Sequence, residues 1–423
     1  MVLSAAATVL GAGTGFVATT FRLVLERAAE LRLTLSGWGH DNNPVLGFAL
    51  VVGGCATATA AAAWLVHRVE PHAEGSGIPR IEGVVAGRIE PARYRLLPVK
   101  YVGGVLAIGS GLSLGREGPS VQMGGMIAHI VSSVTRRNSE DSRALIAAGA
   151  GAGLATAFIA PLAGGVFVLE EIAKRFDPRI TLATVFASAS GFAVAHLMLG
   201  DELVLQIGSL PPPSLRDGPS VLVVGVLAGL LGVLYNRAIM LGLRLADTST
   251  WPVTLRAALI GALIGAIGWY APHVVGSGDE LTRQFLQGQG TVLGLCVLFV
   301  ARFLLGVISY AAGTPGGLFA PLLVLGTDIG LLIGLLGDSV PWHASNPTGL
   351  AIVGMAAFFA ATVRAPVTGL ILAAEMTGSV EMLPPALGAC AVAMLVAYLL
   401  KCEPIYDSLT TRSIRHAREN IVT

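Results

Sequence analysis

The sequence PHAEGSG at residues 71–77 occurs a second time as PHVVGSG at residues 272–278. The two copies lie 201 positions apart, because 272 − 71 = 201. Recurrence at a long and fixed offset is the sequence signature of a duplicated unit. Further matches are therefore expected near the same offset.

Two further landmarks recur in the same order. GREGP at residues 115–119 shares its first glycine and its proline with GLFAP at residues 317–321, an offset of 317 − 115 = 202. APLAG at residues 160–164 matches APVTG at residues 365–369, an offset of 365 − 160 = 205. We predict two diverged repeats, residues 1–205 and residues 206–423, with a Pro-Pro-Pro loop near their junction and a short basic tail at the end of the second.

The composition indicates that the chain lies in lipid. It is 54% hydrophobic and 13% charged, with a mean hydropathy of +0.73, whereas soluble domains carry roughly 25% charged residues. A spanning helix needs about 20 apolar residues, and about a dozen apolar segments occur, several of them shorter than that. We therefore expect an all-α, multi-pass membrane protein. The longest apolar segments are residues 3–21, 45–66, 144–169, 221–243, 292–308, 350–376 and 384–400.

Other classes of protein find little support in the composition. The net charge of +1 gives no case for a nucleic-acid partner. The four cysteines and eight histidines show no ligand spacing, so we expect no disulfide, metal or other cofactor. The first apolar segment lacks a cationic region before it and is interpreted as a retained helix that ends near Phe21. The basic C-terminal tail suggests a cytoplasmic end.

The glycine- and proline-rich landmarks predict interrupted helices at membrane depth. Such irregular backbone is tolerated only where protein buries it or water lines it. Each landmark is expected to start a helix, whose first N–H groups have no partner and which carries about half a positive charge. Several such ends directed at one point form an anion site without a fixed cation. The repeats therefore predict a pathway for small anions near the bilayer midplane.

Acids present in only one repeat are the best functional candidates. Glu170 aligns with Glu375, whereas Glu117 aligns with Phe319 and Glu171 aligns with Met376. An ionisable group within a membrane segment is costly and is a functional hypothesis by default. The alternatives left open are a Glu117 paired with Arg116 in a loop, and a Glu171 that ends a helix beside Lys174 and Arg175.

Other polar residues in apolar segments also allow two interpretations. Ser76, and by symmetry Ser277, could be a helix N-cap. Tyr406 could be an aromatic anchor at the membrane interface, and its spacing alone favours that interpretation. Residues that we expect to pack or pair between helices, or to be structural because both repeats carry them, are Asp328, Arg364, Glu375, His72 and His273.

Three segments resemble the selectivity-filter motifs of the CLC chloride channels and transporters. The resemblance covers about residues 70–410 and includes the sequences LEE at residues 169–171, AEMT at residues 374–377 and PIY at residues 404–406. We refer to the three segments together as the filter motifs. Their residues are Gly75, Ser76, Gly77, Ile78 and Pro79; Gly115, Arg116, Glu117, Gly118 and Pro119; and Gly316, Gly317, Leu318, Phe319, Ala320 and Pro321.

The resemblance implies a homodimer with one pore per subunit and two repeats inserted with opposite orientation, the CLC fold. Ser76 and Tyr406 would bind chloride through hydroxyl groups, and Leu318 and Phe319 through backbone N–H groups. Glu117 would be the gate and the external proton-transfer group, and Glu171 the cytoplasmic-side proton acceptor. Together these residues imply exchange of chloride, and of other small monovalent anions, for protons.

Three alternative functions are compatible with parts of this pattern. A passive, voltage- or pH-gated chloride channel on the same fold is the nearest. An enzyme using Glu117 and Glu171 as acid and base is disfavoured because no nucleophile–base pair or set of metal ligands accompanies them. A transporter of organic anions would need a cationic clamp beyond Arg116. We expect the inner membrane of a bacterium, with neither an additional N-terminal helix nor a nucleotide-sensing domain.

Overall fold

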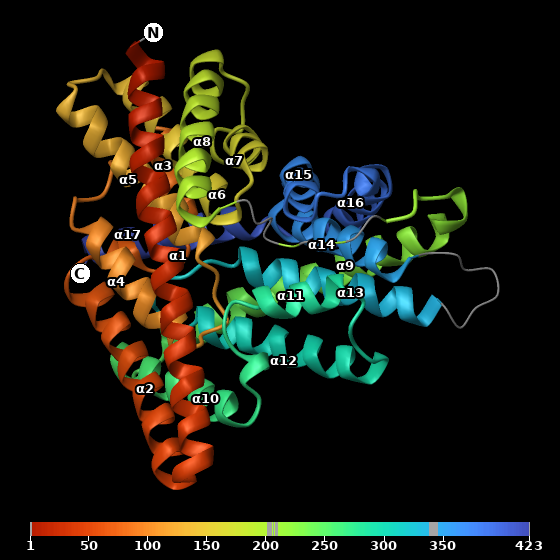
Figure 1. Cartoon of the computed structure of the whole chain (residues 1–423). Helices are drawn as coiled ribbons and strands as arrows, with labels where there is room; N and C mark the ends of the chain where they lie inside the picture. Colours follow the sequence, from red (N-terminus) through yellow and green to blue (C-terminus); the bar gives the residue numbers. More distant parts are fainter. Residues whose placement is uncertain (1, 201–204, 206, 208–209, 338–345, 423) are drawn as a thin grey trace.

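The chain folds into helices that follow one another without a β-strand in the part that the structure describes (Figure 1). This computed structural model describes residues 2–200, 205, 207, 210–337 and 346–422. The first repeat comprises α1 (Val2–Asn42), α2 (Pro44–Arg68), η1 (Pro71–Ala73), α3 (Ile78–Val85), α4 (Leu96–Gly109), α5 (Glu117–Val134), α6 (Ser139–Phe158), α7 (Pro161–Phe167), the π turn η2 (Val168–Ile172) and α8 (Pro178–Leu199).

The second repeat has the same order of long and short helices. It comprises η3 (Leu215–Asp217), α9 (Gly218–Thr248), α10 (Val253–Tyr270), η4 (Pro272–Val274), α11 (Asp279–Leu286), α12 (Val292–Tyr310), α13 (Phe319–Gly337), α14 (Pro347–Val363), α15 (Pro366–Thr377), η5 (Val380–Met382) and α16 (Leu383–Leu399), followed by α17 (Ile405–Val422). Packing repeats as well: α5 lies on α6 as α13 lies on α14, and α1 lies on α8 as α9 lies on α16. The predicted junction at residues 205–206 adjoins residues outside the described part and stays a prediction.

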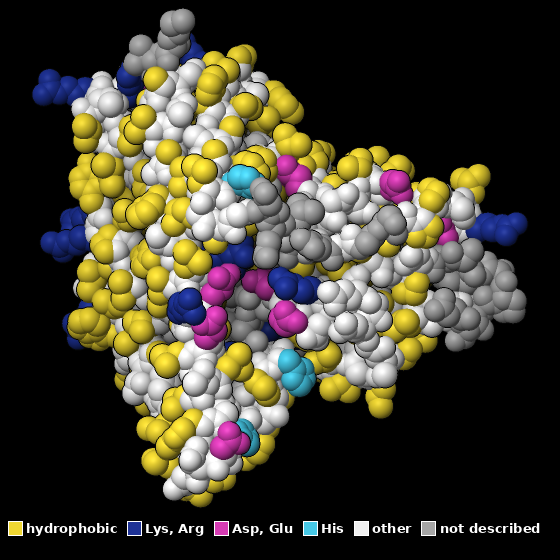
Figure 2. Space-filling view, in the orientation of Figure 1, with side chains coloured by type: hydrophobic (Ala, Val, Ile, Leu, Met, Phe, Trp, Pro, Cys, Tyr) yellow, Lys and Arg dark blue, Asp and Glu magenta, His cyan; other side chains and the backbone are white. Residues whose placement is uncertain are grey.

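Eight helical segments of the described chain are long and apolar enough to cross a membrane. Three of them, α1, α2 and α8, run up the view of Figure 1, whereas α9, α12 and α13 run across it. Apolar side chains cover much of the visible surface in Figure 2, as expected where the solvent is lipid. The short helices α3, α7 and α11 have 8, 7 and 8 residues and cannot span a bilayer alone.

The first helix is longer than the sequence predicts. Instead of ending near Phe21, α1 continues to Asn42. The charged residues that suggested an end are paired along the helix instead, Arg22 with Glu26 at 2.8 Å and Arg27 with Glu30 at 2.7 Å. Pairs at these spacings stabilise a helix and do not interrupt it.

Two long apolar segments are each divided into two helices. Residues 144–169 contain most of α6 and the whole of α7, and residues 350–376 contain most of α14 and of α15. Ile159 and Arg364 follow the first helix of each pair with positive φ angles of 54° and 70°. A proline then opens the next helix in both cases, where its missing N–H costs nothing. The helix starts predicted at the landmarks are thus confirmed.

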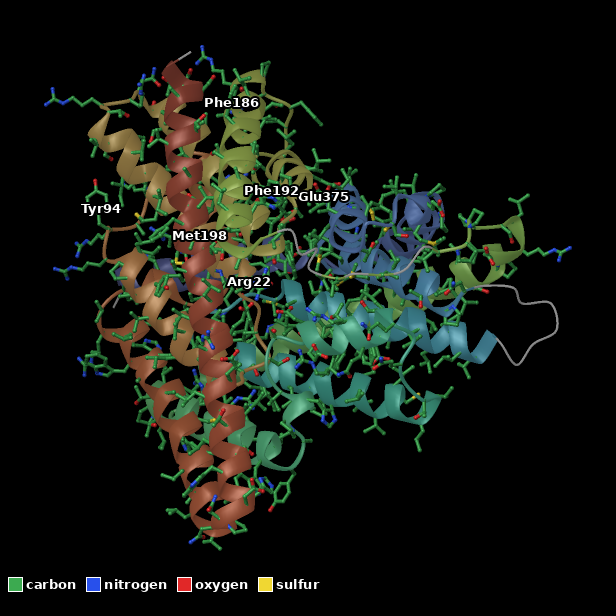
Figure 3. All side chains as sticks on the ribbon, in the orientation of Figure 1. Arg22, Tyr94, Phe186, Phe192, Met198 and Glu375 are labelled. Carbon is green, nitrogen blue, oxygen red and sulfur yellow. The ribbon has the colours of Figure 1, made fainter. Side chains whose placement is uncertain are left out.

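The helices α7 and α15 cap each other across the two repeats. The carboxylate of Glu375, labelled in Figure 3 on α15, accepts hydrogen bonds from the amides of Leu162 at 3.0 Å and Ala163 at 2.7 Å. Glu170 does the same for α15, where it accepts from the amides of Val367 at 3.0 Å and Thr368 at 2.7 Å. This reciprocal arrangement explains why both repeats carry that glutamate.

Pairs of glycines allow the central helices of each repeat to touch. A Cβ atom added to Gly124 of α5 would collide with the carbonyl oxygen of Gly149 on α6, and the reverse also holds. Gly326 of α13 and Gly354 of α14 form the same pair in the second repeat. Small residues permit this close approach of helices in lipid.

We predict that Gly149→Ala and Gly354→Ala each lower the stability of the protein by about 1–3 kcal/mol, since the added methyl group overpacks a backbone contact. Gly54→Ala on α2 is the control, because nothing lies within 4 Å of its added Cβ atom. The measurement is the thermal midpoint in detergent. Equal midpoints for all three variants would contradict this interpretation.

Candidate functional site

Backbone hydrogen bonds bring the three filter motifs together. Gly115 and Gly317 exchange two such bonds, each of 2.8 Å. The amide of Gly75 donates to Thr314 at 3.0 Å, and the amide of Gly316 donates back to Gly75 at 3.0 Å. Two motifs of the first repeat are thus fixed to one motif of the second repeat at the starts of α3, α5 and α13.

Glycine is required where these segments meet. A Cβ atom on Gly118 would lie 2.8 Å from the Cβ atom of Ser76. Gly77 has a φ angle of 78°, in the left-handed region that favours glycine, and lies against Gln122. The glycines of the motifs therefore serve close approach of the backbone and not flexibility.

The structure distinguishes Ser76 from its symmetric counterpart, Ser277. Ser76 is buried against α5, and its Oγ accepts a long hydrogen bond of 3.4 Å from the amide of Ile78. The N-cap position of α3 belongs to Gly77 and has no side-chain cap. Ser277 instead lines an open cavity. The two serines are therefore not equivalent, although the sequence alone could not separate them.

Tyr406 is an internal residue and not an interfacial anchor. It is fully buried at the start of α17, and its ring stacks on that of Phe319 with centroids 6.2 Å apart. Its hydroxyl group has no hydrogen-bond partner in the described structure. The interpretation favoured by spacing alone is therefore wrong, because α17 carries this residue back into the protein.

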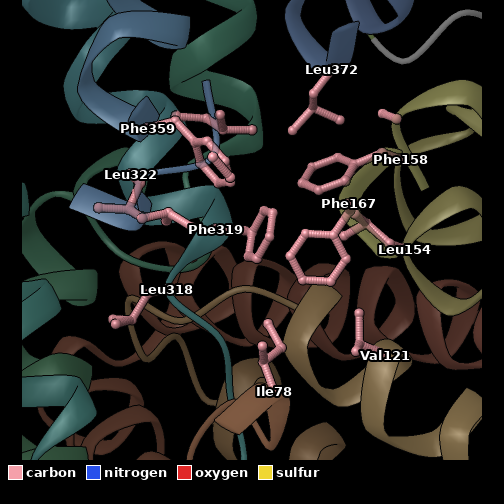
Figure 4. Close-up of a cluster of buried hydrophobic side chains, with 14 of the residues drawn as sticks. Ile78, Val121, Leu154, Phe158, Phe167, Leu318, Phe319, Leu322, Phe359 and Leu372 are labelled. Atoms are coloured by element: carbon pink, nitrogen blue, oxygen red, sulfur yellow. The ribbon is translucent and has the colours of Figure 1, made fainter. Parts of the chain in front are cut away.

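Leu318 and Phe319 lie fully buried where α13 begins. Backbone amides in the first turn of a helix have no intrahelical acceptor. Figure 4 shows the ring of Phe319 facing Phe167, and the ring centroids of the two residues are 5.5 Å apart. The ring of Phe359 packs on another side of Phe319, with the two ring centroids 4.8 Å apart. This packing fixes the position of the α13 N-terminus.

Glu117 is fully buried at the first position of α5. Its carboxylate lies beside Gly115 and the amide of Ala320, but neither oxygen has a partner with hydrogen-bond geometry in the described structure. Arg116 does not pair with it. The guanidinium lies 3.4 Å from the carboxylate of Asp279, so the alternative of an Arg116–Glu117 loop pair is not observed.

A cavity of about 400 Å³ lies next to Arg116. Figure 2 shows a hollow near the centre of the face, ringed by acidic and basic side chains, in the region where Figure 1 places α1 and α11. The cavity is bounded by residues of α1, of α11 and of the loop before α11. Its polar and charged lining residues are Glu26, Arg32, Arg116, His273, Ser277, Asp279 and Glu280.

Glu171 lies in the π turn that follows α7. In this turn the amide of Ala173 donates to Val168, five residues back, at 2.7 Å. Glu171 is 3% exposed, and its Oε1 has no partner in the described structure. Its neighbour Glu170 caps α15 instead. Adjacent glutamates thus have different roles in the fold.

The ion pairs expected for a simple helix-end acid are not recorded at Glu171 in the described part of the chain. Lys174 binds the carboxylates of Glu82 and Asp407, each at 2.8 Å. Arg175 lies 4.0 Å from Asp177. The cations after the helix are therefore engaged elsewhere, and Glu171 faces the interior.

Two buried cations behind the glycine loops were not predicted. Lys100 of α4 donates to the carbonyls of Ala73 at 3.0 Å and Gly75 at 2.6 Å. Arg302 of α12 holds the equivalent loop through the carbonyls of residues 274, 276 and 277. Their offset of 302 − 100 = 202 equals that of the filter motifs, and a matched cation in two apolar segments was the signal that could have revealed them.

The remaining polar candidates have different outcomes. Arg364 donates to the carbonyl of Cys402 at 2.9 Å, as expected of a pairing residue. Asp328 is buried, as expected of a residue packed between helices, and its Oδ1 has no partner in the described structure. His72 lies 2.6 Å from the carboxylate of Glu70, and His273 lines the cavity beside Arg116.

Comparison with known proteins decides the family. The model of the voltage gated chloride channel family matches residues 58–398. The chain belongs to the CLC family. The resemblance carried by the filter motifs is thereby confirmed, and with it the CLC fold, a multi-pass membrane protein of two repeats with broken and re-entrant helices.

Relatives of the chain within the CLC family include bacterial exchangers. It is 36% identical to a protein of Vibrio parahaemolyticus named H(+)/Cl(−) exchange transporter ClcA, over 97% of this chain and 89% of that protein. It is 39% identical to the ClcA of Vibrio cholerae, over 84% and 78%. A solved structure described as a slow cyanobacterial Cl−/H+ antiporter has a TM-score of 0.93 at 31% identity and covers 98% of both chains.

Proposed function

We propose that this protein exchanges chloride for protons across the membrane, as its named relatives do. One observation carries the proposal. Glu117, a carboxylate that only the first repeat contains, is fully buried beside the N-terminus of α13, and neither of its oxygens makes a well-formed hydrogen bond within the described residues. A carboxylate placed where bare amides face a pathway competes with an anion for the same electrostatic stabilisation.

The central anion is held by groups without formal charge. Ser76 and Tyr406 contribute hydroxyl groups, and Leu318 and Phe319 contribute amides at the start of α13. The unpartnered hydroxyl of Tyr406 supports this assignment, because a buried polar group without a partner is rare in a folded protein. Neutral donors bind weakly enough to release the ion, which fast transport requires.

Glu117 couples the two ions through a single side chain. In its ionised form the carboxylate occupies the anion pathway, since two negative charges cannot share it. After it takes up a proton, the neutral side chain leaves the pathway and chloride enters. Glu171, the second unmatched and buried acid, accepts protons on the cytoplasmic side.

The location that fits this activity is the inner membrane of a bacterium. Both named relatives belong to Vibrio species. The basic residues after Tyr406 favour a cytoplasmic C-terminus. Because the two ions are exchanged, outward flow of chloride from loaded liposomes would drive protons inward.

The test uses purified protein in chloride-loaded liposomes, with chloride efflux and external pH recorded together. Wild-type protein is expected to move protons inward against their gradient during efflux. Glu117→Gln is expected to abolish proton movement because the neutral amide cannot take up and release a proton, and Glu171→Gln should abolish it while chloride still flows. Glu140→Gln is the control, because this exposed acid pairs with Arg179.

Two results would contradict the proposal. Chloride efflux without proton movement in the wild-type protein would make the protein a passive channel. Proton coupling that survives in either Glu117→Gln or Glu171→Gln would remove that residue from the exchange.

We further propose that the protein is a homodimer with one pore per subunit. The helices α7 and α15 have 7 and 12 residues, fewer than the roughly 20 needed to match the bilayer. Their first turns nevertheless expose Leu162 at 66% and Val367 at 46%. A protein surface covers such short helices better than lipid does, so this face is where a second copy fits.

The dimer is tested by counting subunits through single-molecule photobleaching in liposomes. The wild-type protein is expected to bleach in two steps, and Leu162→Trp combined with Val367→Trp should shift molecules toward one step because the added bulk blocks close contact. Leu293→Trp on α12, at a site 75% exposed, is the control. Single-step bleaching of the wild-type protein would refute the dimer.

A further inference from the structure

Lys174 joins three separate parts of the protein next to Glu171. Its ammonium lies 2.8 Å from a carboxylate oxygen of Glu82 on α3 and 2.8 Å from one of Asp407 on α17. Lys174 itself follows the π turn that carries Glu171. The side chain of Glu82 is only 10% exposed, whereas those of Lys174 and Asp407 are 41% and 43% exposed. The cluster therefore leads from water to the buried acid.

The charges of the cluster are unbalanced. Glu82, Asp407 and Glu170 each act on Glu171 as like charges, and Lys174 is the cation of the described structure that acts on Glu171. Ionised Glu171, Glu82 and Asp407 around one lysine would leave a net charge of −2. Such an excess favours the uptake of a proton by the most buried carboxyl group.

Lys174 stays charged in this setting. Partial burial alone would lower the pKa of Lys174, but the hydrogen bonds to Asp407 and Glu82 raise the pKa above its usual value. The side chain is thus a fixed positive charge, and it does not carry protons itself.

We propose that Lys174 is a positioning residue with two effects. It sets the pH at which Glu171 takes up and releases protons, and it couples this proton transfer to the anion site. The inference rests on the proposed role of Glu171. Asp407 provides this coupling, because it directly follows Tyr406 at the start of α17. A change in the charge of Glu171 alters the balance on Lys174, and Lys174 holds the helix that positions the Tyr406 hydroxyl.

Further along α17, the helix has a second and independent anchor at Arg412. Arg412 binds both oxygens of Asp247 on α9, at 2.6 and 2.9 Å, and lies 3.5 Å from Glu74. Arg412 thus fixes the helix to both repeats, and Lys174 fixes the start of the helix to the first repeat. Only the contact of Lys174 adjoins Glu171, so only this contact can respond to proton transfer there.

The remaining charged groups near Glu171 have other partners. Both carboxylate oxygens of Glu170 accept hydrogen bonds from α15. Arg175 is 67% exposed and points to Asp177. The charge of Glu170 therefore adds a fixed contribution at Glu171, whereas Lys174, Glu82 and Asp407 form the ion-paired cluster beside it.

The experiment measures proton-coupled chloride flux against cytoplasmic-side pH in oriented liposomes. Lys174→Met removes a positive charge and favours the protonated form of Glu171, so the half-maximal pH should rise by about one unit. Asp407→Asn removes a negative charge and should lower the half-maximal pH. Lys174→Arg keeps the charge and should restore the profile, and Arg175→Met should not change it.

Chloride binding, measured by calorimetry, tests whether the Lys174–Asp407 contact positions α17 at the anion site. Lys174→Met and Asp407→Asn both cut the contact and should weaken binding in the same direction, by up to about fivefold for a partly exposed ion pair. Arg175→Met should have no effect. This pattern of opposite pH shifts with parallel losses of affinity would not arise from a purely structural defect.

Specific results overturn the inference. Equal pH profiles for Lys174→Met and Arg175→Met, or shifts of Lys174→Met and Asp407→Asn in one direction, remove the electrostatic role of Lys174. Unchanged chloride affinity in both cluster variants removes the coupling to the anion site. Proton coupling that persists in Glu171→Gln instead refutes the proposed function of Glu171, which keeps the two failures distinguishable.

Discussion

Unpaired backbone N–H groups at membrane depth are the constraint on which the rest of this structure depends. Lipid cannot satisfy them, so they must be buried in protein or face a pathway. The chain creates such groups by starting α3, α5, α13 and α17 inside the protein. Their positions are then fixed by the paired bonds between Gly115 and Gly317 and by the buried cations Lys100 and Arg302 behind the loops. These cations bind carbonyl oxygens, which leaves the amides free to face an anion.

The duplication accounts for the structural features of the fold, and the residues present in only one repeat are those with a proposed function. Features that both repeats share are structural: the reciprocal caps by Glu170 and Glu375, and the facing glycines of α5 with α6 and of α13 with α14. Features of a single repeat lie where function is proposed. Glu117 occupies the position that Phe319 holds in the other repeat, and these two residues lie near each other at the starts of α5 and α13.

Much of this arrangement could be predicted from the sequence, because proline and glycine specify helix starts locally. The start of α7 at Pro161 and the left-handed Gly77 are examples. What depends on tertiary contacts could not be predicted. Spacing alone favoured an interfacial Tyr406, because nothing local shows that α17 returns to the interior. Ser76 and Ser277 look alike in sequence, and only the structure buries one of them against α5. Likewise, the partners of Lys174 lie far away along the chain.

We propose that neutral hydroxyl and amide donors, and not a fixed cation, hold the anion. The most direct test is a crystal structure with bromide, located by its anomalous scattering. We expect a peak within hydrogen-bond distance of the Ser76 Oγ, the Tyr406 Oη and the amide of Phe319. A strongest peak at Ser277, or at the side chain of Lys100, Arg116 or Arg302, would contradict it.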